Sequence, residues 1–423
     1  MLLVPAIANA QAAAPAPAPM PPPTTPAPAT TDAAPMPPPA EAAPAAPAPA
    51  TAPEAIPKTQ SEVAIPPPPD TAGPTTPNEA MPSTATEEKL PPINVAAWLR
   101  IGARFQGATD PKKINDQQMD NIYGELHAGG KITKNVSVVF NLNANGLSQN
   151  AQIEDAIIGF DIVDEFHVWV GQELVPVDRA NYGGPFFTVP WNYPGFLTVG
   201  GTTTVMAPHE GQNGRNAGVT LWGDVGAGKF KYAVGMFDNG NVASSPLVSG
   251  RISAAFIGEE TGYFGNASYF GDKNILSLGL GGQYQKNGST GGTGVDPKNF
   301  GEFNADLLGE FKLGDSGGWV TGDAAFYHFA GTNEAIHNAF YVMAAIATPK
   351  VGIGNIQPSV RYQWGRGEDQ NGVPAIKASA VDVGLDYLIK GPALRLIANY
   401  QHVDLGGTVI GNAIQLGAQA IFF

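Results

Sequence analysis

The charged residues most suited to act on small molecules lie around one unusual stretch, residues 175–215. It contains an adjacent acid and base, Asp178 and Arg179, and no further Lys or Arg before Arg215. Charged side chains in the narrowest part of a channel select ions of opposite charge. The first question is therefore which elements hold this pair in position.

The stretch 175–215 is rich in Gly and Pro and lacks the period-2 alternation of a strand. A connection this long inside an ordered domain is usually either functional or disordered. Its aromatic residues argue against disorder, because disordered segments are poor in them. We interpret it as a large inward-folded loop whose constriction residues are Asp178, Arg179, Tyr182, Phe186, Phe187, Trp191 and Tyr193.

A succession of strand candidates follows from residue 95 to the C-terminus. We count about sixteen, most of them longer than the usual strand of about 5–6 residues. A tilted strand crosses a bilayer in about 9–11 residues. Only 14% of the residues are charged, and no window holds a long apolar helix. The sequence therefore predicts an all-β fold, a transmembrane antiparallel β-barrel of about sixteen strands.

The connections between these strands alternate in length. Short ones, such as residues 314–317, alternate with long polar ones, such as residues 287–298. Outer-membrane barrels have short periplasmic turns and long outer loops. With the N-terminus in the periplasm, residues 175–214 become the third outer loop. Residues 259–274 are too long for a periplasmic turn, and we interpret residues 263–270 as extra strand.

Alternation within the strands assigns their two faces. Leu99 and Ile101 point one way, whereas Arg100 and Arg104 point the other. A soluble barrel would turn its apolar face inward, around a packed core, and this remains the alternative. Here the polar faces carry charges and Gly, as expected for a wet lumen with lipid outside.

The same parity assigns charged side chains to the pore lining. It also turns Lys229 and Asp161 inward. Acidic rings favour cations and basic rings favour anions, although opposed charges could instead pair and stiffen the wall. The residues assigned to the lining are Arg100, Arg104, Glu125, Asp155, Arg215, Arg251, Arg361, Asp382 and Arg395.

The N-terminal region has a different composition. Residues 1–12 combine a short apolar run with Ala8-Asn9-Ala10, which fits the end of a signal peptide. Residues 13–94 are rich in Ala and Pro, which favours an extended, disordered periplasmic linker that could contact the cell wall. Residues 95–423 form the barrel domain.

Other classes of function find little support. The chain has no Cys, which excludes thiolate metal sites, and its formal net charge of −14 argues against nucleic acid. The six His residues show no recurring ligand spacing, so we expect no metal and no cofactor. A barrel hydrolase needs a Ser–His pair, but no Ser is placed beside His127 or His167. We expect no catalytic residues.

A family resemblance appears in the middle of the chain. The segment Val168-Trp169-Val170-Gly171-Gln172, followed by Val175-Pro176 and later Gly214-Arg215-Asn216-Ala217-Gly218, resembles the phosphate-selective porins of Gram-negative outer membranes. The resemblance covers roughly residues 98–423. It implies a sixteen-stranded barrel that forms homotrimers and whose third outer loop folds into the lumen.

We therefore expect an outer-membrane porin for passive diffusion of small hydrophilic solutes or ions, with lipid around it. Anions such as phosphate are one candidate class, but the loop holds a single base, Arg179, before Arg215, and selectivity stays open. The alternative is a plugged barrel that tethers the cell envelope, or acts as an adhesin, through its Pro-rich arm.

Overall fold

A computed structural model describes most of the chain from residue 93 onward. The expected signal peptide and nearly all of the Pro-rich linker lie outside the described residues, as do residues 195–213 of the long loop. The described ranges are 93–107, 116–145, 150–194, 214–238, 245–289, 296–331, 336–367, 375, 377–406 and 408–422.

Within these ranges the chain forms sixteen long strands and one two-residue strand, β13. All sixteen expected strands are present, with ends that differ by a few residues. The long strands are β1 (Asn94–Gly107), β2 (Asp116–Thr133), β3 (Val136–Asn145), β4 (Gln152–Val163), β5 (Phe166–Leu174), β6 (Arg215–Val225), β7 (Phe230–Asp238), β8 (Leu247–Ile257), β9 (Ile275–Ser289), β10 (Lys298–Lys312), β11 (Trp319–Ala330), β12 (Asn338–Ala347), β14 (Gly354–Arg366), β15 (Lys377–Lys390), β16 (Leu394–Leu405) and β17 (Thr408–Phe422), and β13 is Lys350–Val351.

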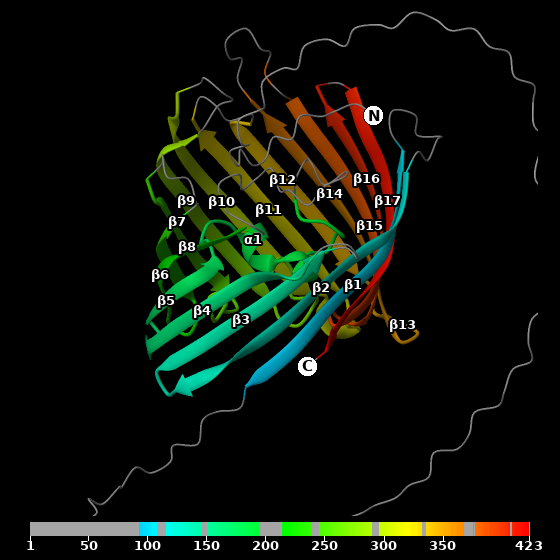
Figure 1. Cartoon of the computed structure of the whole chain (residues 1–423). Helices are drawn as coiled ribbons and strands as arrows, with labels where there is room; N and C mark the ends of the chain where they lie inside the picture. The colour runs from blue at the N-terminus through cyan, green and yellow to red at the C-terminus, as the bar shows by residue number, and fades with distance from the viewer. Residues whose placement is uncertain are drawn as a thin grey trace, which may run out of the picture. The chain divides into compact units, whose positions relative to one another are not determined.

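The strands close into a barrel. Each long strand pairs antiparallel with its neighbours in sequence, and β1 pairs with both β2 and β17. Ala97 of β1, for example, lies opposite Leu126 on one side and Phe422 on the other. Figure 1 shows the tilted ring of strands that results. A closed sheet leaves no unpaired edge, which is the condition for strands to span a membrane.

The polarity of the barrel is the reverse of that of a soluble protein. On β15, the outward Val383 and Leu385 are 49% and 51% exposed, whereas the inward Asp382 and Asp386 are at most 1% exposed. The same alternation of outward apolar and inward polar side chains recurs on the other long strands. The expected polar face is therefore the inner face, although buried apolar side chains such as Phe237, Phe300 and Phe329 also cluster on it. The exposed apolar outer face distinguishes this barrel from a soluble one.

The third long connection, between β5 and β6, folds into the ring. Its described part contains a helix α1 (Arg179–Gly183) and a 3-10 helix η1 (Pro185–Phe187), and Figure 1 shows α1 within the ring of strands. A second 3-10 helix, η3 (Gly314–Ser316), lies in a short turn. Among the described residues, no helix is long and apolar enough to cross a membrane.

The prediction of extra strand at residues 263–270 is wrong. β8 and β9 pair directly with each other, so the residues between them have no strand edge to join. Their backbone N–H groups bond to wall carboxylates instead: Gly262 donates to Asp224, and Tyr269 and Gly271 donate to Glu310. Because these acids point inward, the β8–β9 connection, residues 258–274, also enters the barrel.

Candidate functional site

The lumen and the loop inside it form the candidate site. The loop leaves β5 at Leu174 and returns to β6 at Gly214, whose carbonyl accepts a bond of 2.9 Å from the backbone N–H of Val175. Gly214 has a φ of 76° and lies against the side chain of Asn181, only 2.4 Å from where a Cβ would stand. A glycine is therefore required where the loop rejoins the wall.

Asp178 caps the helix of the loop. Its carboxylate accepts a hydrogen bond of 3.0 Å from the backbone N–H of Asn181 and another from the Tyr327 hydroxyl on β11. The side chain is 2% exposed. Burial raises the pKa of Asp178 to about 6, although both hydrogen bonds act in the opposite direction.

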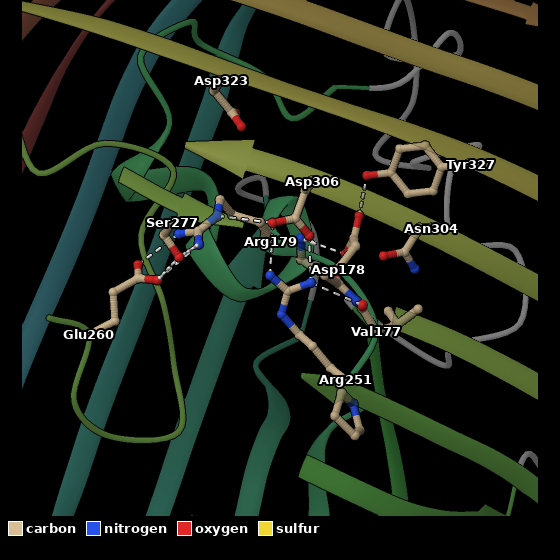
Figure 2. Close-up of polar contacts among 12 residues, drawn as sticks. Val177, Asp178, Arg179, Arg251, Glu260, Ser277, Asn304, Asp306, Asp323 and Tyr327 are labelled. Carbon is tan, nitrogen blue, oxygen red and sulfur yellow. Dashed lines mark hydrogen bonds and ion pairs between the residues drawn. The ribbon is translucent and has the colours of Figure 1, made fainter. Parts of the chain in front are cut away.

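Arg179 is fully engaged with its surroundings (Figure 2). Its Nη1 and Nη2 lie 2.7 and 2.9 Å from the two carboxylate oxygens of Glu260, and its Nε lies 3.2 Å from Asp306 Oδ1. It also donates to Ser277 Oγ at 2.8 Å and to the carbonyl of Asn266 at 3.0 Å. Although burial acts the other way, the Arg179 guanidinium holds the pKa of Glu260 well below its usual range.

Asp306 joins this arginine to a second one. Arg251 Nη2 lies 2.8 Å from Asp306 Oδ1, and Arg251 Nη1 donates to the carbonyl of Val177 at 3.3 Å. A single wall carboxylate on β10 thus binds both Arg179 of the loop and Arg251 of β8 (Figure 2). Charge-assisted bonds of this kind are stronger than neutral ones and fix the loop start against the wall.

Three further wall arginines hold the backbone of the loop. Arg100 Nη1 donates to the carbonyl of Trp191 at 2.7 Å, and Arg361 Nη1 donates to that of Asn192 at 2.8 Å. Arg395 Nη1 lies 3.3 Å from the carbonyl of Val189. The wall acids Asp382 and Asp386 lie 3.0 and 2.8 Å from Arg361 and Arg395 respectively.

The edge of the Trp191 ring lies against two glycines of the wall. A Cβ on Gly102 or Gly417 would come within 2.8 or 2.4 Å of its ring. The guanidinium of Arg100 lies 4.6 Å from the ring centroid, within range of a cation–π interaction. Gly102 of β1 and Gly417 of β17 therefore form the surface against which Trp191 packs, here called the seat of Trp191.

A second group of expected residues lies on β2, β4 and β6. Arg215 is 3.1 Å from Glu154 and 3.2 Å from Asp155. Glu125 is 2.7 Å from His127. Arg215 thus pairs with two carboxylates and also interacts electrostatically with Glu125, which pairs with His127.

Aromatic rings connect the loop to β1 and β2. Phe186 and Phe187 lie 5.3 and 5.4 Å from the ring of Trp98, and Phe186 also lies 5.8 Å from Tyr123. Tyr182 points to another side, 5.2 Å from Tyr263 of the β8–β9 connection. The expected constriction aromatics therefore divide between two faces of the loop.

Most residues expected in the lumen do face it. Arg104 is 7% exposed and points inward with Arg100, and the half-buried Tyr193 gives its carbonyl to Arg361. The assignment of Lys229 to the wall is wrong, because β7 begins one residue later and Lys229 is an exposed turn residue. Asp161 is half-buried near the rim, 3.0 Å from His167.

The sequence interpretation missed several residues of the site. Glu260, Ser277 and Tyr327 all contact one of the two infolded segments. The one available signal was the length of residues 259–274, which breaks the alternation of connections. Among the described residues, no group of three or more His, Asp and Glu could hold a metal ion.

Comparison with known proteins supports the fold. No family model and no curated protein sequence matches the chain. Solved structures do: OprB of Pseudomonas putida covers 78% of this chain and 94% of its own, with 10% identity and a TM-score of 0.53. OmpF of Salmonella typhi, in complex with daunomycin, covers 78% and 97%, with 10% identity and a TM-score of 0.51.

A third match is a loop L8 deletion mutant of OmpT, an outer membrane protein of Vibrio cholerae. It has 14% identity and a TM-score of 0.50, and it covers 78% of this chain and 99% of its own. At these identities the likeness concerns the fold alone. The class that fold and site define is the closed, sixteen-stranded transmembrane β-barrel with an infolded loop.

Proposed function

We propose that the protein is a porin, which lets small hydrophilic solutes and ions diffuse passively across the outer membrane of a Gram-negative bacterium. The observation that carries this proposal is the inverted polarity of a closed barrel whose third long connection is fastened inside the lumen. The apolar outer face fits lipid, and the charged inner face fits water.

In this mechanism the β5–β6 loop narrows the lumen. One group of charged side chains holds the loop, and another faces the solutes. Arg100, Arg251, Arg361 and Arg395 hold the backbone of the loop by their guanidinium groups. Their first role is to position the constriction. We propose that solutes instead meet the group around Arg215, where carboxylates outnumber the basic side chains.

Phosphate selectivity finds no support in this arrangement. An anion site needs guanidinium groups available to the solute, whereas Arg179, Arg251, Arg361 and Arg395 lie beside carboxylates. We propose a channel without preference for phosphate. The proposal assigns no catalysis, since His127 and His167 contact Glu125 and Asp161 rather than a serine.

The remaining parts of the proposal concern assembly and location. The family resemblance implies a homotrimer, in which three barrels pack side by side in the lipid. Residues 13–94 would form an arm in the periplasm, with the cell wall as its possible contact. A plugged barrel that acts through this arm is the competing outcome of the experiment below.

Liposome swelling with sugars of increasing size tests the proposal. We expect vesicles that contain the folded protein to swell quickly in small sugars and progressively more slowly in larger ones. A salt gradient across a planar bilayer gives the reversal potential, which we expect to show a preference for cations. Vesicles that stay impermeable to every solute would contradict the proposal and favour the plugged barrel.

A further inference from the structure

We propose that the β8–β9 connection, residues 258–274, is a second constriction element. It enters the lumen from the end opposite to the β5–β6 loop, and the Arg179–Glu260 pair locks the two together. The cross-section of the channel is then set by both segments. This inference rests on the proposed function as a porin, and it adds the element that determines the size of the solutes.

The two segments come from opposite ends of the barrel. The β5–β6 loop is one of the long connections, and the β8–β9 connection joins strands at the end where the short turns lie. Antiparallel strands alternate in direction, so consecutive connections lie at opposite ends. A contact between these segments can therefore occur only inside the ring.

Wall residues of several strands hold the β8–β9 connection along its length. The carboxylate of Asp224 on β6 accepts a bond of 2.6 Å from the N–H of Gly262. Lys231 on β7 donates to the carbonyl of Phe264 at 3.0 Å. Glu310 on β10 accepts bonds from Ser268 Oγ at 2.8 Å and from the N–H of Gly271 at 2.7 Å. The segment thus bridges from β6 to β10 within the lumen.

Glu260 is the centre of the polar contact between the two segments. Its two oxygens accept the bidentate pair from Arg179, and they also accept the hydroxyls of Ser277 and Tyr269 at 2.6 and 2.8 Å. Glu260 and Arg179 are 4% and 2% exposed. Removing one partner of such a buried pair leaves the other charge uncompensated.

Close packing accompanies this ion pair. A Cβ on Gly183 of α1 would stand 2.9 Å from the backbone nitrogen of Ala267, so the two backbones lie close together here. Farther along, Val189 and Phe270 belong to one apolar cluster with Trp319 of β11. Phe270 has a φ of 52°, a left-handed conformation that costs about 1–2 kcal/mol for a residue with a side chain. The packing of its ring offsets this strain.

A substitution that removes the charge of Glu260 but keeps its shape gives the first test. In planar bilayers, we expect Glu260→Gln to raise the mean single-channel conductance and broaden the distribution of step sizes. The matched control is Glu259→Gln, which removes an exposed carboxylate next in sequence and should conduct like the wild type. Heat-modifiable migration on a gel verifies that each variant is folded.

A disulfide supplies the reverse experiment, because the chain has no other Cys. In Gly183→Cys/Ala267→Cys, the two Cβ atoms start 3.1 Å apart, and the segments must separate by about 0.7 Å to reach the Cβ–Cβ distance of a disulfide, about 3.8 Å. We expect oxidation to cross-link the segments and to return the conductance of the Glu260→Gln variant toward the wild-type value. Reduction should break the disulfide and bring back the raised conductance of the Glu260→Gln variant.

The outcomes separate this inference from the proposed function. A wild-type channel that conducts, together with a Glu260→Gln variant of unchanged conductance, overturns the second constriction and leaves the porin intact. Failure of the cysteine pair to cross-link, while the protein is folded, overturns the contact itself. A wild-type barrel that never conducts overturns the porin, and the cross-link then still reports whether the two segments meet.

Discussion

At the scale of single residues, most charges inside the barrel hold other parts of the chain in place. Arg395 illustrates this: it pairs with Asp386 and reaches the carbonyl of Val189, and neither charged side chain is more than 1% exposed. A buried pair gains little over an apolar pair of similar shape, but breaking it leaves a buried charge without compensation. These residues therefore serve to position the constriction.

Removal of one partner of this pair should destabilise the barrel strongly. We expect Arg395→Met to lower the free energy of unfolding by about 3–5 kcal/mol, because Asp386 stays buried alone. The double variant Arg395→Met/Asp386→Leu should recover much of that loss. Urea unfolding in lipid vesicles measures both. Equal stabilities for the single and double variants would show that the pair is not coupled.

The stability of the β5–β6 loop should depend on pH through Asp178. Burial raises the pKa of Asp178 from 3.8 to about 6 in the folded protein, so the folded state binds the proton more tightly than the unfolded chain. This contribution is complete below about pH 4 and is lost as the pH rises through about 6.

Asp178→Asn removes this titration and serves as the comparison. Relative to the wild type, the variant should gain stability between pH 4 and pH 8, by up to about 3 kcal/mol. Thermal unfolding in detergent at a series of pH values gives the difference between the two proteins. A difference that stays constant over this range would contradict the assignment of the raised pKa to Asp178.

At the scale of elements, the strands and the infolded β5–β6 loop were predictable, but the inward β8–β9 connection and the contacts between the two segments were not. Strand positions follow from alternation, which depends only on neighbours such as Arg100 and Ile101. The partners of Arg179, Glu260 and Asp306, lie far away in the sequence, and no local sequence pattern indicates them. The length of residues 259–274 marked that connection as unusual, but length alone did not show that it folds inward rather than adding a strand.

The seat of Trp191 offers a test at this scale. We expect Gly417→Ala to push the indole ring away from β17, because the new Cβ would stand 2.4 Å from it, and overpacking of this kind typically costs about 1–3 kcal/mol. The control is Gly124→Ala on the outward face of β2, where the nearest atom is 3.9 Å away. Urea unfolding and tryptophan fluorescence report stability and ring position. Equal behaviour of the two variants would contradict the proposed seat.

At the scale of the whole molecule, reversed polarity is the defining property of the barrel. Its outer surface presents side chains such as Leu385 and Val360, each about half exposed at 51% and 49%. Water would disfavour such a surface, whereas hydrocarbon accepts it. With this polarity, charged side chains are tolerated on the inner face of the barrel and are unfavourable on its outer face.

A charged side chain placed on the outer face should therefore destabilise the barrel. We expect Leu385→Arg on the outer face to cost about 2–4 kcal/mol if it lies near the bilayer midplane. Gly384→Arg, one residue away, would clash with Ser359 and is unsuitable as a partner, so the control is Lys377→Leu at the exposed end of the same strand. Folding into vesicles, followed by heat-modifiable gel migration, gives the relative stabilities. Tolerance of Leu385→Arg would contradict lipid contact at that face.

The most direct test of the central claim, that this barrel is a porin narrowed by an infolded loop, is the single-channel conductance of the folded protein in a planar bilayer. We expect discrete, stable conductance steps at low membrane potentials, and a reversal potential in a salt gradient that reports the preference for cations. Complete electrical silence from protein that migrates on a gel as a folded, heat-modifiable barrel would contradict it.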